Sequence, residues 1–350
     1  MVETKEFVTF DHPAFTKPEN TAFVFPGQGI QKVGMGRDIF EYSEGARETY
    51  RIADEIATEF GYSVSDISFN GPKEDLDRLS QTLILTRNRA YGVAVCEHLG
   101  KNFRPAAVAG YSLGELNAIE FAGSGKYTDL FRAVETRREE CKKANGKAPG
   151  GEAAIILRET GLTADYTQFL SEGLIYLNKT EGLYLALATS DTYFVIAGTN
   201  EALKGAEEFV KDFRRRTGNK GILFQRLAVE GAYHTPLMLP AQEGLRKTLN
   251  ETEILDANIP IIANTTGQPM EKAKDIRAEI LAHLISPVQW YRSIRRLYKT
   301  GIRYVVEPGD KPLITSVSLK EGRILLPVKA EENGPDLAYI LMPGEEAYAA

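Results

Sequence analysis

A short apolar stretch, Ala106 to Ala109, runs directly into the five residues Gly110-Tyr111-Ser112-Leu113-Gly114. This spacing fits the GxSxG elbow, in which glycines admit the strained backbone of a serine on a sharp turn between strand and helix. The turn exposes the hydroxyl, and the N-terminus of the following helix favours negative charge that develops there. The five letters alone are a weak signal, but their place after an apolar strand and before a helical pattern predicts that Ser112 is a nucleophile.

A serine nucleophile needs a base, and the chain has four histidines, His12, His98, His234 and His283. His98 and His283 sit in helical patterns, where a structural or surface histidine is the common case, and His12 lies in the polar N-terminal segment. His234 lies in a loop between a strand and a helix, which is a typical place for a functional residue. The residues alone leave His234 open between a general base and a structural histidine.

The elements that must position these residues alternate between strands and helices. Residues 21–25 are expected to form a short buried strand that ends in the loop Pro26-Gly27-Gln28-Gly29. Helical patterns follow at 44–60, at 83–99 and, after the elbow, at 127–144. Strand, turn and helix in this order predict an α/β fold with a parallel sheet.

In the middle of the chain the sequence pattern changes at the glycine-rich residues 145–151, which indicate a boundary between two parts of the chain. A charged helical pattern follows at 201–216, and the strand-like stretches around it are 153–157, 174–177, 183–188, 193–197 and 222–229. We therefore expect a discontinuous core over residues 1–150 and 228–350, with a small α+β subdomain inserted at 151–227. In the second part of the core, 259–263 and 304–306 are expected strands, and the tail after Asp336 carries little pattern.

The composition excludes several classes of protein. The 350 residues are 43% hydrophobic and 26% charged, which is ordinary for a globular enzyme. No apolar run approaches the roughly 20 residues that span a bilayer, and the polar N-terminus lacks the apolar centre of a secretory signal. The two cysteines, Cys96 and Cys141, show no metal-ligand spacing. We expect a cytoplasmic monomer that does not bind a membrane and needs no metal or other cofactor.

The charge pattern bears on partners. A net charge of −6 argues weakly against nucleic acid, although local patches can still be basic. One basic cluster consists of Lys211, Arg214, Arg215, Arg216 and Lys220. The second consists of four residues whose spacing places them on one helix face: Arg292, Arg295, Arg296 and Lys299. A solvated surface is the commoner meaning of such a cluster, and a docking face for an acidic, phosphate-bearing partner is the alternative.

Four motifs in one order give the sequence a family resemblance. They are FPGQG at 25–29, GYSLGE at 110–115, GAYHTP at 231–236 and SPVQW at 286–290. With them, residues 21–325 resemble the malonyl-CoA:acyl carrier protein transacylase family, which includes the acyltransferase domains of fatty acid and polyketide synthases. The resemblance implies an α/β-hydrolase-like core with an inserted ferredoxin-like subdomain, and an acyl pocket between the two.

The resemblance also implies roles for single residues. Ser112 would be the nucleophile and His234 its general base, and the backbone carbonyl of Gln289 would orient the imidazole. The backbone N–H groups of Gln28 and Leu113 would form an oxyanion hole, in which each donor is worth about 3 kcal/mol.

The acyl pocket combines one match to the family with two departures. Arg137, in the stretch VETR, matches the family arginine and would hold the free carboxylate of a malonyl group through two parallel hydrogen bonds; composition alone would make it a surface charge. Tyr111 stands where relatives usually have histidine, and 189–191 (TSD) stands where they often have Asn-Ser. These departures leave the acyl group open, although the pair Tyr233-His234 is nearer to the malonyl-type pattern than to the methylmalonyl-type Tyr-Ala-Ser-His.

The resemblance predicts a ping-pong transfer, in which malonyl moves from coenzyme A to Ser112 and then to the phosphopantetheine thiol of an acyl carrier protein. The alternative is a hydrolase that removes misloaded acyl groups from carrier proteins with the same serine and histidine. Relatives with that activity tend to lose the arginine, so Arg137 argues against it. An inactive relative that only docks a carrier protein is disfavoured by the complete set of Ser112, His234 and Gln28.

Overall fold

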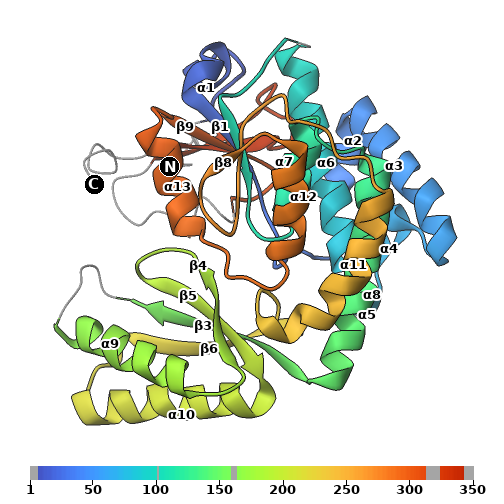
Figure 1. Cartoon of the computed structure of the whole chain (residues 1–350). Coiled ribbons are helices and arrows are strands. Elements are labelled where there is room, and N and C mark those ends of the chain that lie inside the picture. Colours follow the sequence, from blue (N-terminus) through green and yellow to red (C-terminus); the bar gives the residue numbers. More distant parts are fainter. Residues whose placement is uncertain (1–6, 101, 159–163, 313–323, 343–350) are drawn as a thin grey trace.

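The computed structural model describes residues 7–100, 102–158, 164–312 and 324–342. Two sheets of unequal size, with helices around each, build the described chain (Figure 1). The strands of the larger sheet are β1 (Thr21–Phe25), β2 (Ala107–Gly110), β7 (Ile261–Ile262), β8 (Pro269–Met270), β9 (Tyr304–Pro308), β10 (Ile324–Val328) and β11 (Ala338–Met342). The α-helices of this part are α1 (Pro13–Thr16), α2 (Arg37–Tyr42), α3 (Glu44–Ala57), α4 (Val64–Asn70), α5 (Lys73–Arg78), α6 (Ser80–Leu99), α7 (Gly114–Phe121), α8 (Tyr127–Lys147), α11 (Leu239–Glu251), α12 (Ala273–Ala282) and α13 (Trp290–Lys299). Three 3-10 turns join them: η1 (Pro18–Asn20), η2 (Thr58–Phe60) and η3 (Pro236–Met238).

The larger sheet has the strand order β10-β11-β9-β1-β2-β7-β8. Its centre is parallel, because β1 pairs with β9 and β2, and β2 pairs with β7. All five residues of β1 are buried, as expected of an apolar parallel strand that is covered on both faces. Antiparallel strands close the edges. The loop after β1 and the elbow after β2 leave neighbouring parallel strands at the same edge, which is where ligands bind in open α/β sheets.

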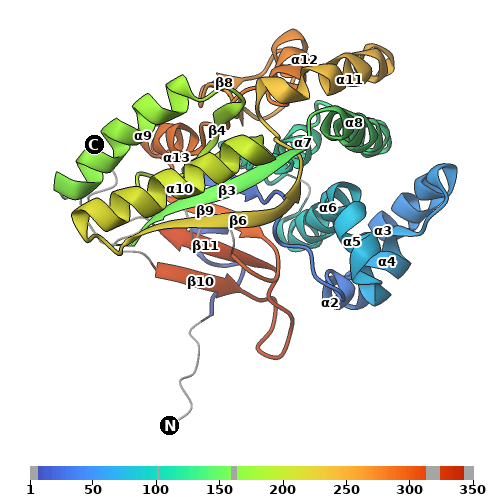
Figure 2. The same cartoon turned by 90° about the horizontal axis from the view of Figure 1, so that it is seen from below.

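Caps and apolar spacing define the helices around this sheet. α3 begins after Ser43, whose hydroxyl accepts a hydrogen bond from the Ala46 N–H at 2.9 Å. It then buries one face, which includes Tyr50 and Ala53. α6 is buried along most of its circumference, because it packs between α3, α7 and α8. Figure 2 shows α2 to α5 gathered at one end of the molecule, beyond α6.

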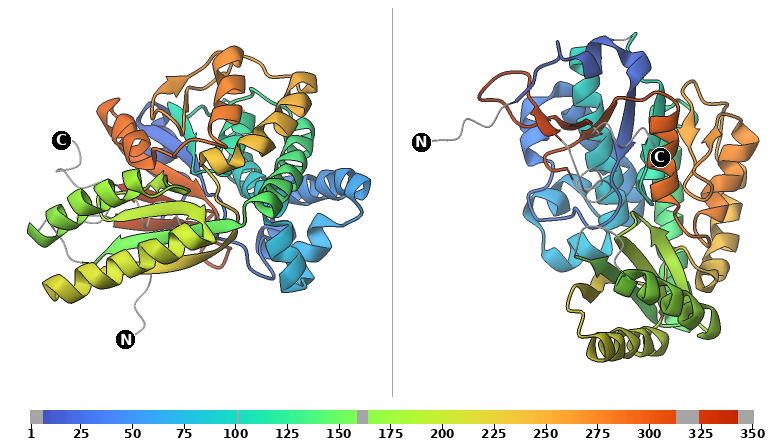
Figure 3. Two further views of the ribbon diagram at one scale, coloured as in Figure 1. Left: turned by 60° about the horizontal axis from the view of Figure 1, so that its bottom comes forward. Right: turned by 90° about the vertical axis from the view of Figure 1, so that its left-hand side faces the viewer.

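The smaller sheet is inserted after α8. Its strands are β3 (Gly150–Leu157), β4 (Leu183–Ala188), β5 (Tyr193–Thr199) and β6 (Ile222–Glu230), in the order β4-β5-β3-β6 with antiparallel neighbours throughout. The helices α9 (Ala164–Lys179) and α10 (Asn200–Thr217) cover one face of this sheet, and the unit projects as a lobe from the larger part (Figure 3). The β-α-β-β-α-β order is that of a ferredoxin-like unit. Its own small apolar core includes Ile155, Phe169 and Phe213.

The structure differs from the sequence-based expectations in two elements. Residues 174–177 were expected as a strand, but they lie inside α9. An apolar run of four residues fits either element, and here Leu174 and Ile175 are exposed on the helix rather than buried in a sheet. The tail was expected to carry little pattern, but Ala338–Met342 forms β11 between β9 and β10. Residues 343–350 lie outside the described ranges, as do residues 1–6 of the polar N-terminus.

Candidate active site

The turn that follows β2 has the geometry of the predicted elbow. Ser112 has a φ of 53°, in the left-handed region that non-glycine residues rarely adopt. The two glycines of the motif are required by space, because a Cβ at Gly110 would collide with the backbone of Gly114, and a Cβ at Gly114 would collide with the carbonyl of Phe25. The N-terminus of α7 follows at Gly114. The serine is therefore held at the edge of the sheet by a backbone that only this motif permits.

His234 meets this serine from the loop after β6. Its Nε2 lies 2.7 Å from Ser112 Oγ, and its Nδ1 lies 2.7 Å from the backbone carbonyl of His283. Because a carbonyl can only accept, Nδ1 carries the proton and Nε2 is left as an acceptor for the serine hydroxyl. His234 also has a positive φ of 60°. The imidazole is thus fixed in the tautomer that a general base requires.

The expectation that Gln289 orients this imidazole is wrong. The carbonyl of Gln289 accepts the Ser293 N–H at 3.0 Å, because Gln289 is the N-terminal cap of α13 and its carbonyl joins the first turn of that helix. His283 is the C-terminal cap of α12, and the last carbonyls of a helix have no partner within that helix. One of these free carbonyls receives the His234 Nδ1–H.

Burial controls the protonation of His234. The side chain is 2% exposed, and burial lowers its pKa to about 3, helped by the positive charge of Arg137 and opposed by the hydrogen bond to His283. The ring of His283 lies beside it, with the two ring centres 4.9 Å apart. The imidazole is therefore neutral near pH 7, with Nε2 unprotonated toward the serine hydroxyl.

Asn264, which the sequence-based reasoning missed, supports the elbow from β7. Its Oδ1 accepts the N–H of Ser112 at 2.9 Å, and its Nδ2 donates to the carbonyl of Gly110 at 2.7 Å. The N–H of Asn264 donates in turn to the buried carboxyl of Glu115 at 2.8 Å. A polar residue directly after the expected strand 259–263 is the signal that could have indicated it.

The loop after β1 packs against the elbow, as the oxyanion-hole expectation requires. A Cβ at Gly27 would collide with the carbonyl of Tyr111 and would lie 3.5 Å from the N–H nitrogen of Leu113. Within the described residues, the backbone N–H groups of Gln28 and Leu113 donate to no protein group. The side chain of Gln28 turns away and donates to Ser80 Oγ at 3.0 Å. Both N–H groups remain free for an oxyanion on this side of Ser112.

Arg137 on α8 is buried, with 2% of its surface exposed, rather than on the surface as composition suggests. Its Nη1 donates to the side-chain oxygen of Gln81, and its guanidinium carbon lies 5.3 Å from the centre of the Tyr233 ring. Gln81 also donates to the Tyr233 hydroxyl at 3.2 Å. The Nε and Nη2 groups of Arg137 have no hydrogen-bond partner in the described part of the chain. A buried cation with two free donors is suited to a carboxylate ligand.

Tyr111 and Tyr233, which directly precede Ser112 and His234 in the chain, line one cavity of about 430 Å³. Ser112 and His234 line this cavity together with Gln28, Tyr111, Glu152 and Tyr233. The hydroxyl of Tyr111 lies 2.7 Å from that of Thr189 in the insert. Arg137 does not itself line the cavity, and the ring of Tyr233, which does line it, contacts the guanidinium. Five of the eight predicted residues, Gln28, Tyr111, Ser112, Tyr233 and His234, line this cavity. Leu113 lies in the elbow, Arg137 contacts the ring of Tyr233, and Gln289 caps the start of α13.

Comparison with known proteins decides the family. A model of the acyl transferase domain matches residues 22–332. The chain is 30% identical over 309 residues to the malonyl CoA-acyl carrier protein transacylase of Bacillus subtilis (strain 168), which covers 87% of this chain and 91% of that protein. This chain belongs to the acyl transferase family. The resemblance drawn from the four motifs is confirmed, and so is the expectation of an acyltransferase.

Solved structures support the same assignment of this acyltransferase. An acyl carrier protein S-malonyltransferase from Vibrio cholerae O1 has a TM-score of 0.73 at 29% identity, over 86% of this chain and 93% of that one. The complex of a type II polyketide synthase acyl carrier protein with its malonyl-transacylase gives a TM-score of 0.74 at 26% identity, over 86% and 92% of the two chains. The α/β fold predicted from the sequence is confirmed.

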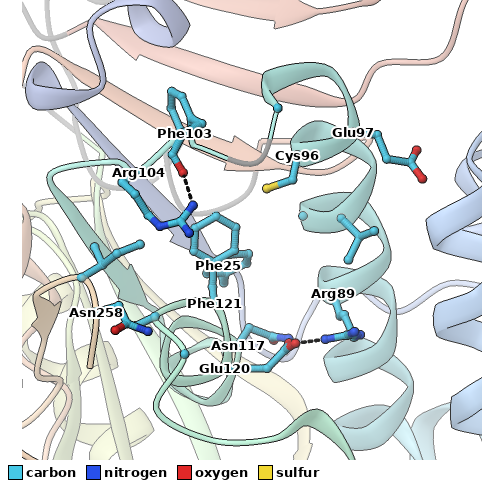
Figure 4. A pocket seen from close by; sticks show the side chains of 16 residues that line it. Phe25, Arg89, Cys96, Glu97, Phe103, Arg104, Asn117, Glu120, Phe121 and Asn258 are labelled. Atoms are coloured by element: carbon cyan, nitrogen blue, oxygen red, sulfur yellow. Dashed lines mark hydrogen bonds and ion pairs between the residues drawn. The ribbon is translucent and has the colours of Figure 1, made fainter. Parts of the chain in front are cut away.

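The acyltransferase also has a larger cavity, of about 740 Å³, between α6 and α7 (Figure 4). It is lined by Phe25, Cys96, Phe121 and the ion pair of Arg89 with Glu120. Burial raises the pKa of Cys96 to about 11, so its thiol is a poor nucleophile. Size alone thus does not identify the candidate site, because Ser112 and His234 line the smaller cavity.

Two searches of the described ranges gave negative findings. No group of three or more histidine, cysteine, aspartate or glutamate side chains is placed to hold a metal ion there. No helix within the same ranges is both long and apolar enough to cross a membrane. The expectations of a cofactor-free, cytoplasmic monomer remain predictions.

Proposed function

We propose that this acyltransferase moves a malonyl or related carboxylated acyl group from coenzyme A to the phosphopantetheine thiol of an acyl carrier protein. The observation that carries the proposal is the 2.7 Å contact of Ser112 Oγ with His234 Nε2, with Nδ1 held by a carbonyl. The similar Bacillus subtilis protein is named for this activity, and one similar structure holds a carrier protein with its malonyl-transacylase.

In the first half-reaction, His234 Nε2 takes the hydroxyl proton while Ser112 Oγ attacks the thioester carbon. The N–H groups of Gln28 and Leu113 stabilise the oxyanion. The carbon–sulfur bond then breaks, the sulfur of coenzyme A takes the proton from His234, and the acyl group remains as an ester on Ser112. In the second half-reaction, the carrier-protein thiol gives its proton to His234 and attacks the ester carbon. The carbon–oxygen bond breaks, and the proton returns to Ser112 Oγ.

The free donors of Arg137 support a carboxylated acyl group. A carboxylate taken from water into a buried site without a partner carries a heavy desolvation cost. Arg137 offers Nε and Nη2, which are adjacent donors of the kind that bind both oxygens of a carboxylate. Tyr233 and Gln81 hold the guanidinium in place through the contacts described above. The carboxylate end of the acyl group would therefore lie beside Tyr233, with its thioester carbon at Ser112.

The test is to separate transfer from hydrolysis. The enzyme is loaded with malonyl-CoA, freed from excess donor, and divided between buffer, a holo carrier protein, and the same carrier protein without phosphopantetheine. We expect rapid movement of the malonyl group to the holo carrier protein and slow loss in the other two samples. Equal loss in all three samples would instead favour the hydrolase that removes misloaded groups.

A further inference from the structure

Glu152 is a buried carboxyl group in the wall of the acyl cavity, and the mechanism above does not use it. It lies near the start of β3, is 6% exposed, and lines the same cavity as Ser112 and His234. Its carboxyl group makes no hydrogen bond or ion pair among the described residues, and its charge interaction is with Arg137 at longer range. Buried polar groups without partners are rare in native proteins, and each calls for an explanation.

The sheet is irregular at this residue. The β3–β6 ladder pairs Gly151 with Glu230 and then Ala153 with Arg226, so the pairing shifts at Glu152. On β6, Leu227 to Val229 lie between these two pairs, opposite the single residue Glu152, and they line the cavity. Bulges next to active sites commonly redirect side chains. Here the irregularity coincides with a residue that lines the cavity.

The other charged groups of the cavity are already satisfied. Lys73 and Asp77 line its mouth, where both are exposed and form an ion pair at 2.5 Å. Besides the uncharged Ser112, His234 and two glutamines, the cavity wall includes the phenols of Tyr111, Tyr193 and Tyr233 and apolar side chains such as Leu187. Glu152 is therefore the one buried carboxyl group among the described residues that line this cavity.

The protonation of Glu152 suits it to a neutral polar ligand. Burial raises its pKa to about 8, and the charge of Arg137 offsets part of that shift. Near pH 7 the group is mainly a neutral acid, which can donate one hydrogen bond and accept others. A hydroxyl group has the matching capacity to accept and donate.

We propose that Glu152 is a specificity-determining residue, whose carboxyl group hydrogen-bonds a hydroxyl substituent on the acyl group loaded at Ser112. This inference rests on the proposed acyl transfer. Arg137, which belongs to the larger part, binds the terminal carboxylate. Glu152, which belongs to the insert, hydrogen-bonds a second polar group on the same acyl chain. An alkyl branch of the same size would leave the buried carboxyl group unpaired, and such sites discriminate strongly against the analogue that lacks the hydrogen bond.

The test compares two acyl groups of nearly equal size. Hydroxymalonyl-CoA and methylmalonyl-CoA are offered in competition, and intact mass spectrometry gives the ratio of the two acyl-enzymes, with malonyl-CoA loading measured separately for each protein. We expect the wild type to favour hydroxymalonyl by about tenfold or more. Glu152→Met should reverse the preference, whereas Glu152→Gln, which keeps a donor and an acceptor, should retain most of it. Asp77→Asn removes the exposed carboxyl group of the same cavity and should leave the ratio unchanged.

Three results would overturn the inference. One is a wild type that loads malonyl yet does not favour hydroxymalonyl, and another is a Glu152→Met ratio equal to that of the wild type. The third is a lower melting temperature in both Glu152 variants together with reduced malonyl loading, which would make Glu152 a structural counter-ion of Arg137. A wild type that loads no malonyl would instead contradict the proposed acyl transfer, so the two failures can be told apart.

Discussion

Ser112 and His234 are the two non-glycine residues with positive φ angles in the described chain, at 53° and 60°. Such backbone conformations cost of order 1–3 kcal/mol each, and they persist where the surrounding structure holds them in place. Asn264 holds the first through hydrogen bonds to both sides of the elbow, and the Leu284 carbonyl holds the second by accepting the His234 N–H at 3.1 Å. The strain therefore coincides with the two groups that must meet at 2.7 Å.

Arg137→Ala should weaken loading from malonyl-CoA by about 3–5 kcal/mol, because the buried carboxylate then lacks its partner. Loading from acetyl-CoA, which has no carboxylate, should fall far less. The measurement is kcat/KM for self-acylation with each donor. Arg132→Ala, on the exposed side of the same helix, is the matched control. Equal losses for both donors would mean that Arg137 does not bind the carboxylate of the acyl group.

Tyr111 should tune the acyl pocket without taking part in the chemistry. Its hydroxyl contacts Thr189 rather than Ser112 or His234, and its ring packs edge-on against Trp290. Tyr111→His and Tyr111→Phe should each shift the relative loading of malonyl-, methylmalonyl- and acetyl-CoA by about tenfold or more. The competition assay with all three donors measures these ratios. Unchanged ratios would mean that Tyr111 has no part in selecting the acyl group. Complete loss of acylation in Tyr111→Phe would mean that its hydroxyl takes part in the chemistry.

At the scale of elements, the sequence predicted best where the signal is local. The strand at 21–25, the elbow and the helices at 44–60 and 83–99 follow from apolar runs, glycines and caps, and the structure has them. The missed features depend on distant parts of the chain. The carbonyl that holds His234 comes from the end of α12, and β11 exists because β9 and β10 lie on either side of it. No spacing within the sequence encodes either contact.

Helix α13 carries the better candidate surface for a carrier protein. Its four cations, Arg292, Arg295, Arg296 and Lys299, are exposed or half-buried and form no ion pair with any described carboxylate. The other basic cluster, at residues 211–220 on and after α10, differs because three of its members pair with acidic neighbours: Lys211, Arg215 and Arg216. Carrier proteins are generally acidic near their phosphopantetheine serine. An unpaired basic face offers them more electrostatic attraction than a neutralised one.

Charge reversal at Arg292 and Arg296 should therefore raise the KM for the carrier protein and leave self-acylation from coenzyme A unchanged. Surface charges are screened, so the effect should shrink as salt is added. The matched control is charge reversal at Lys211 and Arg215 on α10, which should have little effect on either half-reaction. If both half-reactions fall together in the α13 variant, that helix has a structural role instead.

At the scale of the whole molecule, the insert and the larger part share the cavity. Glu152 comes from the insert, and the elbow comes from the larger sheet. The two parts are joined where Val288 pairs with β4 through backbone hydrogen bonds of 2.8 and 2.9 Å. A site built in this way buries titratable groups between two lobes, so the stability of the whole chain should depend on pH.

Glu152→Gln should stabilise the protein at pH 8 and change little at pH 4. The unfolded chain loses the Glu152 proton near its ordinary pKa of 4.5, whereas burial holds the folded pKa near 8. Stability is therefore lost as the pH rises from 4.5 to 8. Over this range, the free energy of unfolding of the variant should exceed that of the wild type by about 1 kcal/mol more for each pH unit. Urea unfolding at several pH values measures it, and a constant difference would mean that Glu152 is ionised in the folded protein.

Ser112 should carry the acyl group, and peptide mapping after loading shows whether it does. The enzyme is mixed with malonyl-CoA, quenched, digested and mapped by mass spectrometry. We expect one malonyl adduct, on Ser112, that is absent in Ser112→Ala and forms far more slowly in His234→Ala. An adduct on any other residue, or no adduct with any acyl-CoA, would contradict it.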